Sequence, residues 1–203
     1  MEKQAFTGKE TKKLNEYARE QYEKMNGARF YRNADFILFL LTYAIIAIAI
    51  RTFLFEPVRV DGVSMLPTLQ DGETMFVEKV SYMSGEPERG DIVICFYPGY
   101  KESCVKRVIG LPGETVTILS GKIWIDDEPL DEGEYWGDVI LSWDMQFKVE
   151  EGSVFVMGDN RNASKDSRNS SVGSIPYEKI LGKVRAVIWP IRDFRTFGKV
   201  AYS

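Results

Sequence analysis

Residues 91–125 read DIVICFYPGYKESCVKRVIGLPGETVTILSGKIWI, and this stretch decides the fold. Its runs of Val, Ile, Phe and Trp are separated by dipeptides typical of turns, namely Pro98-Gly99, Pro112-Gly113 and Ser120-Gly121. Each run has the length of a strand and is too short for an ordinary helix. The stretch therefore predicts consecutive antiparallel strands joined by tight turns.

Similar short runs continue on both sides of that stretch, at residues 75–80, 153–157 and 183–189. Beyond residue 56, no segment with helical periodicity exceeds two turns, apart from a short candidate at residues 174–180. Residues 56–203 are therefore predicted to form a mainly β, antiparallel domain.

The composition excludes several classes of function. The chain has 203 residues, a net charge of −4 and no histidine. Since there is no cationic surplus to neutralise phosphates, a nucleic-acid partner is not expected. The lack of histidine excludes Ser-His-Asp and Cys-His catalysis and every zinc site with a histidine ligand. Acid/base chemistry must then use carboxylates, lysine, tyrosine or cysteine.

The two cysteines, Cys95 and Cys104, are too few for a disulfide framework or an all-cysteine zinc site. Their spacing allows a bridge between two arms of a hairpin in an oxidising compartment. Two unrelated buried thiols are the favoured interpretation, because free cysteine is readily buried.

Residues 36–50, FILFLLTYAIIAIAI, carry no charge, and after Arg51 the apolar run continues to Phe55. Twenty helical residues at about 1.5 Å each span about 30 Å, the thickness of a bilayer core. A buried soluble helix would show a polar face, and this run has none. A cleavable secretory signal is the stronger alternative, because Ala47-Ile-Ala49 resembles a cleavage site. However, a long segment precedes the run, so residues 36–55 are predicted to be an uncleaved transmembrane helix.

Charges beside this run predict its orientation. Arg29 and Arg32 flank its start, whereas the sequence beyond it is acidic. The positive-inside rule therefore places residues 1–35, a solvated helix or tail, in the cytoplasm. Residues 56–203 then face outward. The protein is predicted to be a single-pass protein of the cell membrane, with the lipid bilayer as a partner.

The first segment with possible chemistry is Pro57-Val-Arg-Val-Asp-Gly-Val-Ser-Met-Leu-Pro-Thr-Leu69. If residues 58–64 are extended, their two-residue period places four residues on one face: Val58, Val60, Gly62 and Ser64. A peptide backbone can approach such a face closely. Pro67 prevents a regular strand or helix from continuing, so the strand ends at the serine. Taken alone, a serine in such a turn is more often structural than nucleophilic.

The second segment is Cys104-Val-Lys-Arg-Val-Ile-Gly-Leu-Pro-Gly113. In a strand, Lys106 and Arg107 point to opposite faces, so one of them must share a face with buried hydrophobic neighbours. Moving the pKa of a lysine from about 10.4 to near 7.5 requires about 4 kcal/mol of differential desolvation, which burial can supply. A neutral amine is a competent general base for a serine hydroxyl. Without histidine, a Ser–Lys dyad is one of the few hydrolytic routes left.

The third segment, Gly158-Asp-Asn-Arg-Asn-Ala-Ser-Lys-Asp-Ser-Arg168, follows a predicted strand and is dense in hydrogen-bonding side chains. It does not fit a calcium loop, because Arg161 and Lys165 fall among the candidate ligands. Taken alone, it is best interpreted as a polar loop held by its own side chains.

These segments, in this order behind an N-terminal anchor, resemble the membrane-bound type I signal peptidases of bacteria. The matching motifs are Ser64-Met-Leu-Pro-Thr-Leu69, Gly90-Asp-Ile-Val93, Lys106-Arg-Val-Ile-Gly-Leu-Pro-Gly113 and residues 158–168. They cover about a seventh of the chain. Each motif is moderately specific, and the four in order are strongly so.

The resemblance implies a reaction centre made of two residues, with Ser64 as the nucleophile and Lys106 as its general base. Some relatives carry a serine two residues before the nucleophile, whereas this chain has Gly62 there. The oxyanion would then depend on backbone donors, including the N–H of Ser64.

The resemblance also implies supporting residues in the third segment. Ser164 would hydrogen-bond the lysine amine and orient it. Asp166 would form an ion pair with Arg168, with Arg107 as a further partner. The family's inserted β subdomain would be present in a reduced version, at about residues 114–152.

The implied activity is that of a serine endopeptidase that removes signal peptides from secretory preproteins after small residues, through an acyl-enzyme. The substrate would pair as an extended strand beside residues 58–64. Val58, Val60 and Val105 would form shallow walls for the small residues. Neither a metal nor a cofactor is required.

Two alternatives stay open. One is another Ser/Lys protease, such as a self-cleaving repressor-type domain, although the anchor and the lack of a DNA-binding domain count against it. The other is a non-catalytic, membrane-tethered β domain that acts in assembly or adhesion. That second alternative predicts that Ser64→Ala leaves function intact.

Overall fold

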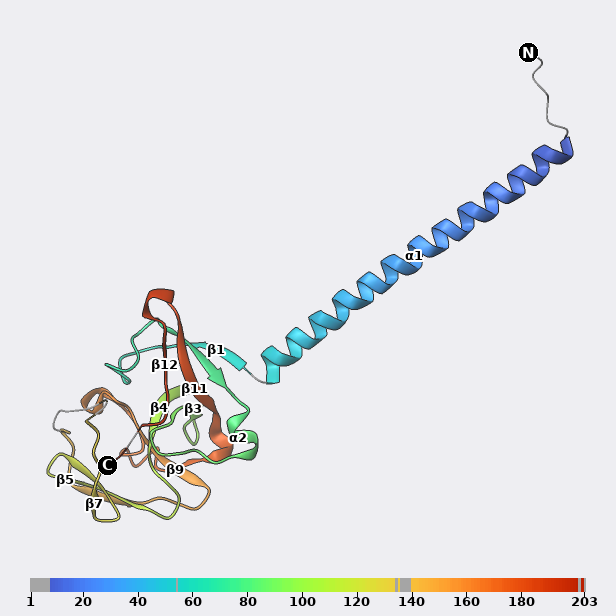
Figure 1. Ribbon diagram of the computed structural model, residues 1–203. Helices are drawn as coiled ribbons and strands as arrows, with labels where there is room; N and C mark the ends of the chain where they lie inside the picture. Colours follow the sequence, from blue (N-terminus) through green and yellow to red (C-terminus); the bar gives the residue numbers. More distant parts are fainter. Residues whose placement is uncertain (1–7, 54, 134, 136–139, 201, 203) are drawn as a thin grey trace. The chain divides into compact units, whose positions relative to one another are not determined.

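The structure, a computed structural model, describes residues 8–53, 55–133, 135, 140–200 and 202. The chain divides into two compact units, and the boundary falls between Ile50 and Arg51. The first unit is helical, and the second holds all the described strands (Figure 1).

The helix α1 (Gly8–Phe53) is continuous over 46 residues. The side chains from Phe36 to Ile50 are all exposed, so nothing in the described protein covers the apolar run. In the part of the chain that the structure describes, no helix is both long enough and apolar enough to span a membrane.

The described side chains do not include Arg29, Arg32 and Arg51, on which the predicted orientation and helix end depend. The helix ends at Phe53, and Phe55 already begins a strand. The predicted helix end at residue 55 is therefore wrong by two residues, because Phe55 and its neighbours pair with β2 instead.

An eight-stranded sheet forms the larger part of the second unit. Its strands lie in the order β1-β2-β11-β3-β4-β9-β10, with β12 paired to β11, and every pairing is antiparallel. Their bounds are β1 Phe55–Arg59, β2 Thr74–Glu78, β3 Ile92–Phe96, β4 Ser103–Gly110, β9 Ser153–Met157, β10 Ile175–Pro176, β11 Ile180–Trp189 and β12 Arg195–Thr196. The mainly β, antiparallel prediction is confirmed.

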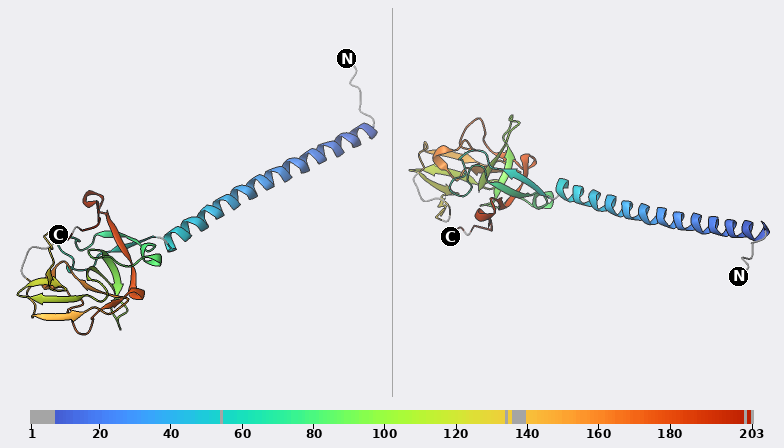
Figure 2. Two further views of the ribbon diagram at one scale, coloured as in Figure 1. Left: turned by 60° about the horizontal axis from the view of Figure 1, so that its bottom comes forward. Right: turned by 90° about the horizontal axis from the view of Figure 1, so that it is seen from above.

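A smaller sheet of four strands, in the order β7-β6-β5-β8, lies within the range predicted for the inserted subdomain. Its strands are β5 Thr115–Leu119, β6 Lys122–Ile125, β7 Glu128–Pro129 and β8 Met145–Lys148. The β5–β6 turn uses Ser120 and Gly121 at φ 51° and 76°, the left-handed conformation that a two-residue hairpin needs. The views agree that this sheet lies at the end of the second unit away from β1 (Figures 1 and 2).

Four short helical turns connect the strands: α2 Ser81–Ser84, η1 Arg161–Ala163, η2 Tyr177–Lys179 and η3 Ile191–Asp193. Only η2 falls within the short helix predicted at residues 174–180. It is a single 3₁₀ turn, because Ile175 and Pro176 belong to β10 and Ile180 opens β11.

Three hydrophobic clusters form the core, and β4 contributes to each of them. Val105 belongs to the cluster around Met65 and Leu69, Val108 to the cluster around Val93 and Cys95, and Ile109 to the cluster beneath the small sheet. From Val105 to Gly110 every residue of β4 is buried. The strand therefore has no solvent face there, and both of its basic residues are forced inside.

Candidate active site

Ser64 and Lys106, 42 residues apart in the sequence, are in direct contact. The Nζ of Lys106 donates a hydrogen bond of 2.8 Å to the Oγ of Ser64 and another of 2.8 Å to the carbonyl of Val105. Lys106 lies in the middle of β4 and is only 4% exposed. A hydroxyl thus lies within proton-transfer distance of a buried amine.

The described contacts of Lys106 include no counter-charge. None of the ion pairs among the described residues includes Lys106, and both of its hydrogen-bond partners are uncharged. A buried ammonium without a carboxylate has a large desolvation cost, whereas a neutral amine does not. The arrangement therefore places an amine without a carboxylate partner directly beside a hydroxyl.

Ser64 does not continue a strand, so the predicted extended stretch over residues 58–64 is wrong. β1 ends at Arg59, and Gly62 adopts φ +94°, a conformation that suits glycine. The N–H of Gly62 donates to the carboxylate of Asp71 at 2.9 Å, and the N–H of Leu66 closes a turn onto Val63. The chain turns here instead of presenting a flat face.

The loop at residues 158–168 holds the peptide groups around Ser64. The N–H of Asn160 donates to the carbonyl of Ser64 at 2.9 Å, and its Nδ2 donates to the carbonyl of Val63 at 3.0 Å. A Cβ added to Gly158 would collide with the Ser64 carbonyl and the Ser164 side chain. Our sequence analysis missed Asn160 and Gly158, although the density of hydrogen-bonding residues in this loop was a signal.

Ser164 does not make the contact expected of it. Its Oγ donates a long hydrogen bond of 3.5 Å to the carbonyl of Lys165, and Lys106 has other partners. Ser164 is instead packed against Gly158, on the side that faces the backbone of Ser64. The expected orientation of the lysine amine by Ser164 is absent from this structure's described contacts.

Asp166 and Arg168 form an ion pair of 2.8 Å, and Asp166 is 1% exposed. Asp166 also accepts the N–H of Gly158 at 3.0 Å, and Arg168 donates to the carbonyl of Arg161 at 2.6 Å. These bonds tie both ends of the loop to its middle. They fix the loop that in turn holds Ser64.

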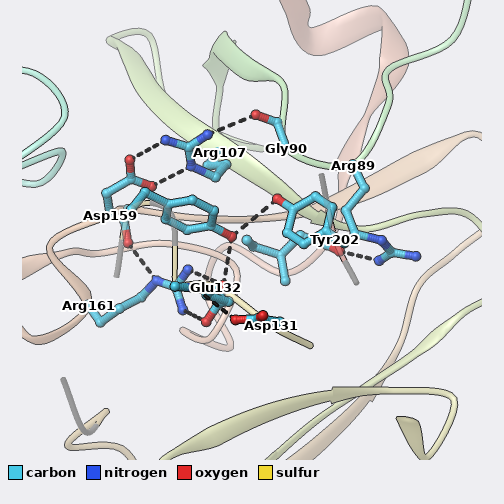
Figure 3. Close-up of polar contacts among 12 residues, drawn as sticks. Arg89, Gly90, Arg107, Asp131, Glu132, Asp159, Arg161 and Tyr202 are labelled. Atoms are coloured by element: carbon cyan, nitrogen blue, oxygen red, sulfur yellow. Dashed lines mark hydrogen bonds and ion pairs between the residues drawn. The ribbon is translucent and has the colours of Figure 1, made fainter. Parts of the chain in front are cut away.

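Arg107 pairs with Asp159, so its expected pairing with Asp166 is wrong. Two nitrogens of Arg107 reach the Asp159 carboxylate at 2.8 and 2.6 Å, and a third donates to the carbonyl of Gly90 at 3.0 Å (Figure 3). The cause lies in the strand period: Arg107 points to the face of β4 opposite to Lys106. Burial works to lower the pKa of Arg107, and the bonds with Asp159 outweigh it and raise that pKa.

Asp159 was missed by our sequence analysis. It is fully buried and also accepts the hydroxyl of Thr68 at 2.5 Å. It therefore ties the segment after Ser64 to the loop and to β4. The loop has two acidic residues, Asp159 and Asp166, and the sequence does not show which of them meets Arg107.

Arg161, the next arginine of the loop, pairs with a residue of the segment between β7 and β8. Its two terminal nitrogens reach the carboxylate of Glu132 at 2.6 and 2.5 Å, and both side chains are buried (Figure 3). The ring of Tyr135 lies 3.9 Å from the Arg107 guanidinium and 5.8 Å from that of Arg161. The two arginines thus share one buried network under the loop.

A cavity of about 620 Å³ opens beside the Ser64–Lys106 pair. Val105 lines it together with Arg59, Phe96 and Cys104. Val60 lines a neighbouring cavity of about 420 Å³, and Val58 lines neither of the two. The three predicted wall residues are therefore not brought together in one pocket.

Another cavity, of about 390 Å³, lies on the Arg107 side of β4. Its cationic lining residues are ion-paired: Arg107 with Asp159, Lys183 with Asp91, Arg195 with Glu73 and Lys199 with Glu88. This cavity offers no uncompensated positive charge. The Ser64 cavity is the one with a nucleophile and a base.

A hydroxyl beside a buried, unpaired amine, at the mouth of an open cavity on a β scaffold, has the chemistry of a serine hydrolase with a lysine base. The comparisons with known proteins identify the family. The sequence model of the family described as "Signal peptidase, peptidase S26" matches residues 33–189. The chain therefore belongs to the signal peptidase family, and with it to the serine endopeptidases.

Individual relatives match over most of their length. The chain is 43% identical over 159 residues to a signal peptidase I of Bacillus amyloliquefaciens, covering 74% of this chain and 82% of the relative. It is 43% identical over 161 residues to signal peptidase I T of Bacillus subtilis, with the same coverage. A crystal structure of a signal peptidase I from Enterococcus faecalis aligns at 30% identity with a TM-score of 0.42, covering 48% of this chain and 96% of that one.

Proposed function

We propose that this protein is a membrane-anchored signal peptidase that removes N-terminal signal peptides from secretory preproteins. Ser64 is the nucleophile and Lys106 the general base. The observation that carries the proposal is the 2.8 Å hydrogen bond between Ser64 and Lys106 at a cavity wall, with no carboxylate paired to the amine. The signal peptidases named above support the substrate class.

The chemistry is acyl transfer. In the reactive form the neutral amine of Lys106 accepts the hydrogen of the Ser64 hydroxyl, so the direction of their hydrogen bond reverses. Ser64 Oγ attacks the scissile carbonyl, and the ammonium then protonates the leaving amine. The same amine next removes a proton from water, which hydrolyses the acyl-enzyme. The carbonyl of Val105, held at 2.8 Å from Nζ, keeps the amine aimed throughout.

The oxyanion requires donors that point at the reacting carbonyl. Gly62 has no side-chain donor, and its N–H is occupied by Asp71. We assign the Ser64 N–H as one donor, in agreement with the turn that ends the segment. The two hydrogen bonds from Asn160 keep this turn rigid.

The substrate binds as an extended strand beside β1 and the turn that follows it. Support comes from the position of β1 at the end of the sheet order, where β2 is its pairing partner among the described strands. A free strand edge can accept a peptide by main-chain hydrogen bonds. Val60 and Val105 line the two cavities that flank this path, and they restrict the entering side chains to small ones.

The membrane anchor is formed by residues 36–53 of α1. Its support is the uncharged run Phe36–Ile50, which is helical and exposed along its described length. Such an apolar helix, uncovered by protein, is stable in lipid. With the N-terminus in the cytoplasm, the second unit lies at the outer membrane surface, where a signal peptide ends.

The test is cleavage of a purified preprotein by the full chain in detergent micelles, with the new N-terminus read by mass spectrometry. The intact protein should cut after a small residue. Ser64→Ala should abolish cleavage while the thermal unfolding midpoint stays within a few degrees. Rapid acid quenching of the intact protein should trap a peptide ester on Ser64.

Ser171→Ala is the matched control, because Ser171 is an exposed serine whose hydroxyl donates to Asn169, two residues away. Its cleavage rate should equal that of the intact protein. Full cleavage by Ser64→Ala would contradict the proposal and favour the non-catalytic alternative. Cleavage only of the protein's own chain would favour the self-processing one.

A further inference from the structure

The two cysteines lie directly opposite each other on neighbouring strands. Cys95 of β3 and Cys104 of β4 are register partners in an antiparallel pair, and their sulfur atoms are 3.6 Å apart. Opposed residues in such a pair have Cα atoms about 4.5–5.5 Å apart, within the 4.4–6.8 Å that a disulfide spans. The backbone therefore already has the separation that a bridge requires.

The two thiols differ sharply in access. Cys95 is fully buried in the core beside Val93 and Tyr97. Cys104 is half-buried and lines the same 620 Å³ cavity as Ser64 and Lys106. A reagent that enters the cavity meets the sulfur of Cys104 first.

The two thiols also differ in acidity. The hydrogen bond from Cys95 lowers the pKa of Cys104 to about 7; burial opposes this effect, and Lys106 adds to it when it is in its ammonium form. The same hydrogen bond and burial raise the pKa of Cys95. Near pH 7, about half of Cys104 is therefore thiolate, whereas Cys95 stays a thiol. Only a thiolate attacks a disulfide.

We infer that Cys104 and Cys95 form a thiol–disulfide exchange site in the wall of the Ser64 cavity, with Cys104 as the attacking residue and Cys95 as the resolving one. The co-reactant is a small-molecule disulfide that enters the cavity. The geometry of the proposed exchange site comes from the opposed register of the two cysteines and from the greater exposure of Cys104.

The exchange proceeds in two balanced steps. The Cys104 thiolate attacks one sulfur of the small disulfide RSSR, forming a mixed disulfide and releasing RS⁻. Cys95 then loses its proton to solvent and attacks Cys104 Sγ, forming the internal disulfide and releasing the second RS⁻. Two protein thiols are oxidised, and one small disulfide is reduced to two thiols.

The two products should affect the cavity differently. The mixed disulfide places its R group beside Ser64, in the substrate's path. The internal disulfide draws both sulfurs into the β3–β4 wall and leaves the cavity open. The consequence for cleavage rests on the proposed function, whereas the exchange chemistry does not.

The experiment treats the reduced full chain in detergent micelles with oxidised glutathione at neutral pH and follows its intact mass. The native chain should end as the internal disulfide, lighter by two hydrogens and without an adduct, and a proteolytic digest should contain the cross-linked peptide. Cys95→Ala should stop at one glutathione adduct. Cys104→Ala should acquire an adduct at least tenfold more slowly than Cys95→Ala.

The native-chain measurement does not depend on any variant being folded. Two free thiols after prolonged treatment, or a stable adduct on the native chain, would overturn the inference. Equal rates for the two variants would overturn the assigned order of attack.

A second measurement separates this inference from the proposed function. Reduced Cys95→Ala should cleave a preprotein as well as the native chain does. Its glutathione adduct should cleave at least tenfold more slowly and recover with dithiothreitol. An adduct with undiminished activity would contradict the position of Cys104 in the substrate path. Failure of every reduced protein to cleave would contradict the proposed function alone, because the mass measurements would be unaffected.

Discussion

Lys106 and Arg107 are neighbours on β4, and each is 4% exposed. The two faces of the strand nevertheless surround these two basic side chains with very different groups. On one face Lys106 contacts a hydroxyl and a backbone carbonyl. On the other, Arg107 has a bidentate carboxylate, a carbonyl and an aromatic ring. Two equally buried basic side chains can therefore have very different partners.

The difference shows how one strand serves both reactivity and rigidity. The Arg107 face is electrostatically complete, since Asp159 compensates the charge and raises the pKa of the guanidinium above its ordinary value. On the Lys106 face no described carboxylate compensates the basic side chain, and its partners are the Ser64 hydroxyl and the Val105 carbonyl. Asp159, the partner of Arg107, is followed in the chain by Asn160, whose N–H donates a hydrogen bond to the carbonyl of Ser64.

The largest effect is expected from giving Lys106 a permanent charge. Lys106→Arg keeps the cation and loses the base, so cleavage of a preprotein should fall by about 10⁴-fold, as for loss of a catalytic base elsewhere. Lys122→Arg, at the exposed first residue of β6, is the matched control, and its cleavage rate should be unchanged. Steady-state cleavage rates measure both. Activity within tenfold of the native value would refute the role of the amine.

The next effect is expected from removing the counter-charge on the other face. Asp159→Asn leaves the Arg107 cation buried and uncompensated, which should destabilise the protein by about 3–5 kcal/mol. Denaturant unfolding of the two variants and the native chain measures the loss.

Lys199→Ala, which removes an exposed ion pair with Glu88, is the comparison for that variant. Its unfolding midpoint should match that of the native chain. If Asp159→Asn were equally neutral, the Arg107 face would not be the rigid support described above.

A smaller effect is expected where the rigid loop touches the reactive turn. Gly158→Ala places a methyl group against the carbonyl of Ser64, and overpacking of this kind costs about 1–3 kcal/mol. A shift of Ser64 by about 1 Å should lower cleavage by about a hundredfold. Gly198→Ala has open space around its added carbon and should change neither property. Unfolding and cleavage assays together distinguish a displaced nucleophile from simple loss of fold.

The smallest effect concerns the thiol beside Lys106. Since the pKa of Cys104 is lowered to about 7, its alkylation by iodoacetamide should rise with pH to a half-maximum near 7. Cys95→Ala removes the hydrogen bond that stabilises the thiolate, so the midpoint should move upward and the rate at pH 7 should fall about threefold. A midpoint near 9 in the native chain would contradict the assigned environment.

Much of the β scaffold was predictable, because short runs of neighbouring residues determine where its strands and turns form. The strand runs between Gly-containing turns became β2, β3, β4, β9 and β11, and a period of two already placed the two basic residues of β4 on opposite faces. The local argument reached only a possible Ser–Lys dyad, and the resemblance to the signal peptidases supplied Ser64 and Lys106 as its members.

The rest depends on contacts between distant segments. The turn at Gly62 follows from its bond with Asp71, and no periodicity reports that bond. Asp159 and Asp166 are both acidic residues of one loop, and only the three-dimensional arrangement shows which of them meets Arg107. For the same reason the sequence could not show that Ser164 packs against Gly158 instead of reaching the lysine.

The ion pair between Arg161 and Glu132 connects the small-sheet insert to the loop at residues 158–168. The acid that neutralises this arginine comes from the segment between β7 and β8, so the insert holds the counter-charge for a loop it does not belong to. Shortening or exchanging the insert is therefore constrained at one point: a replacement without a carboxylate there removes the ion pair between the insert and the loop.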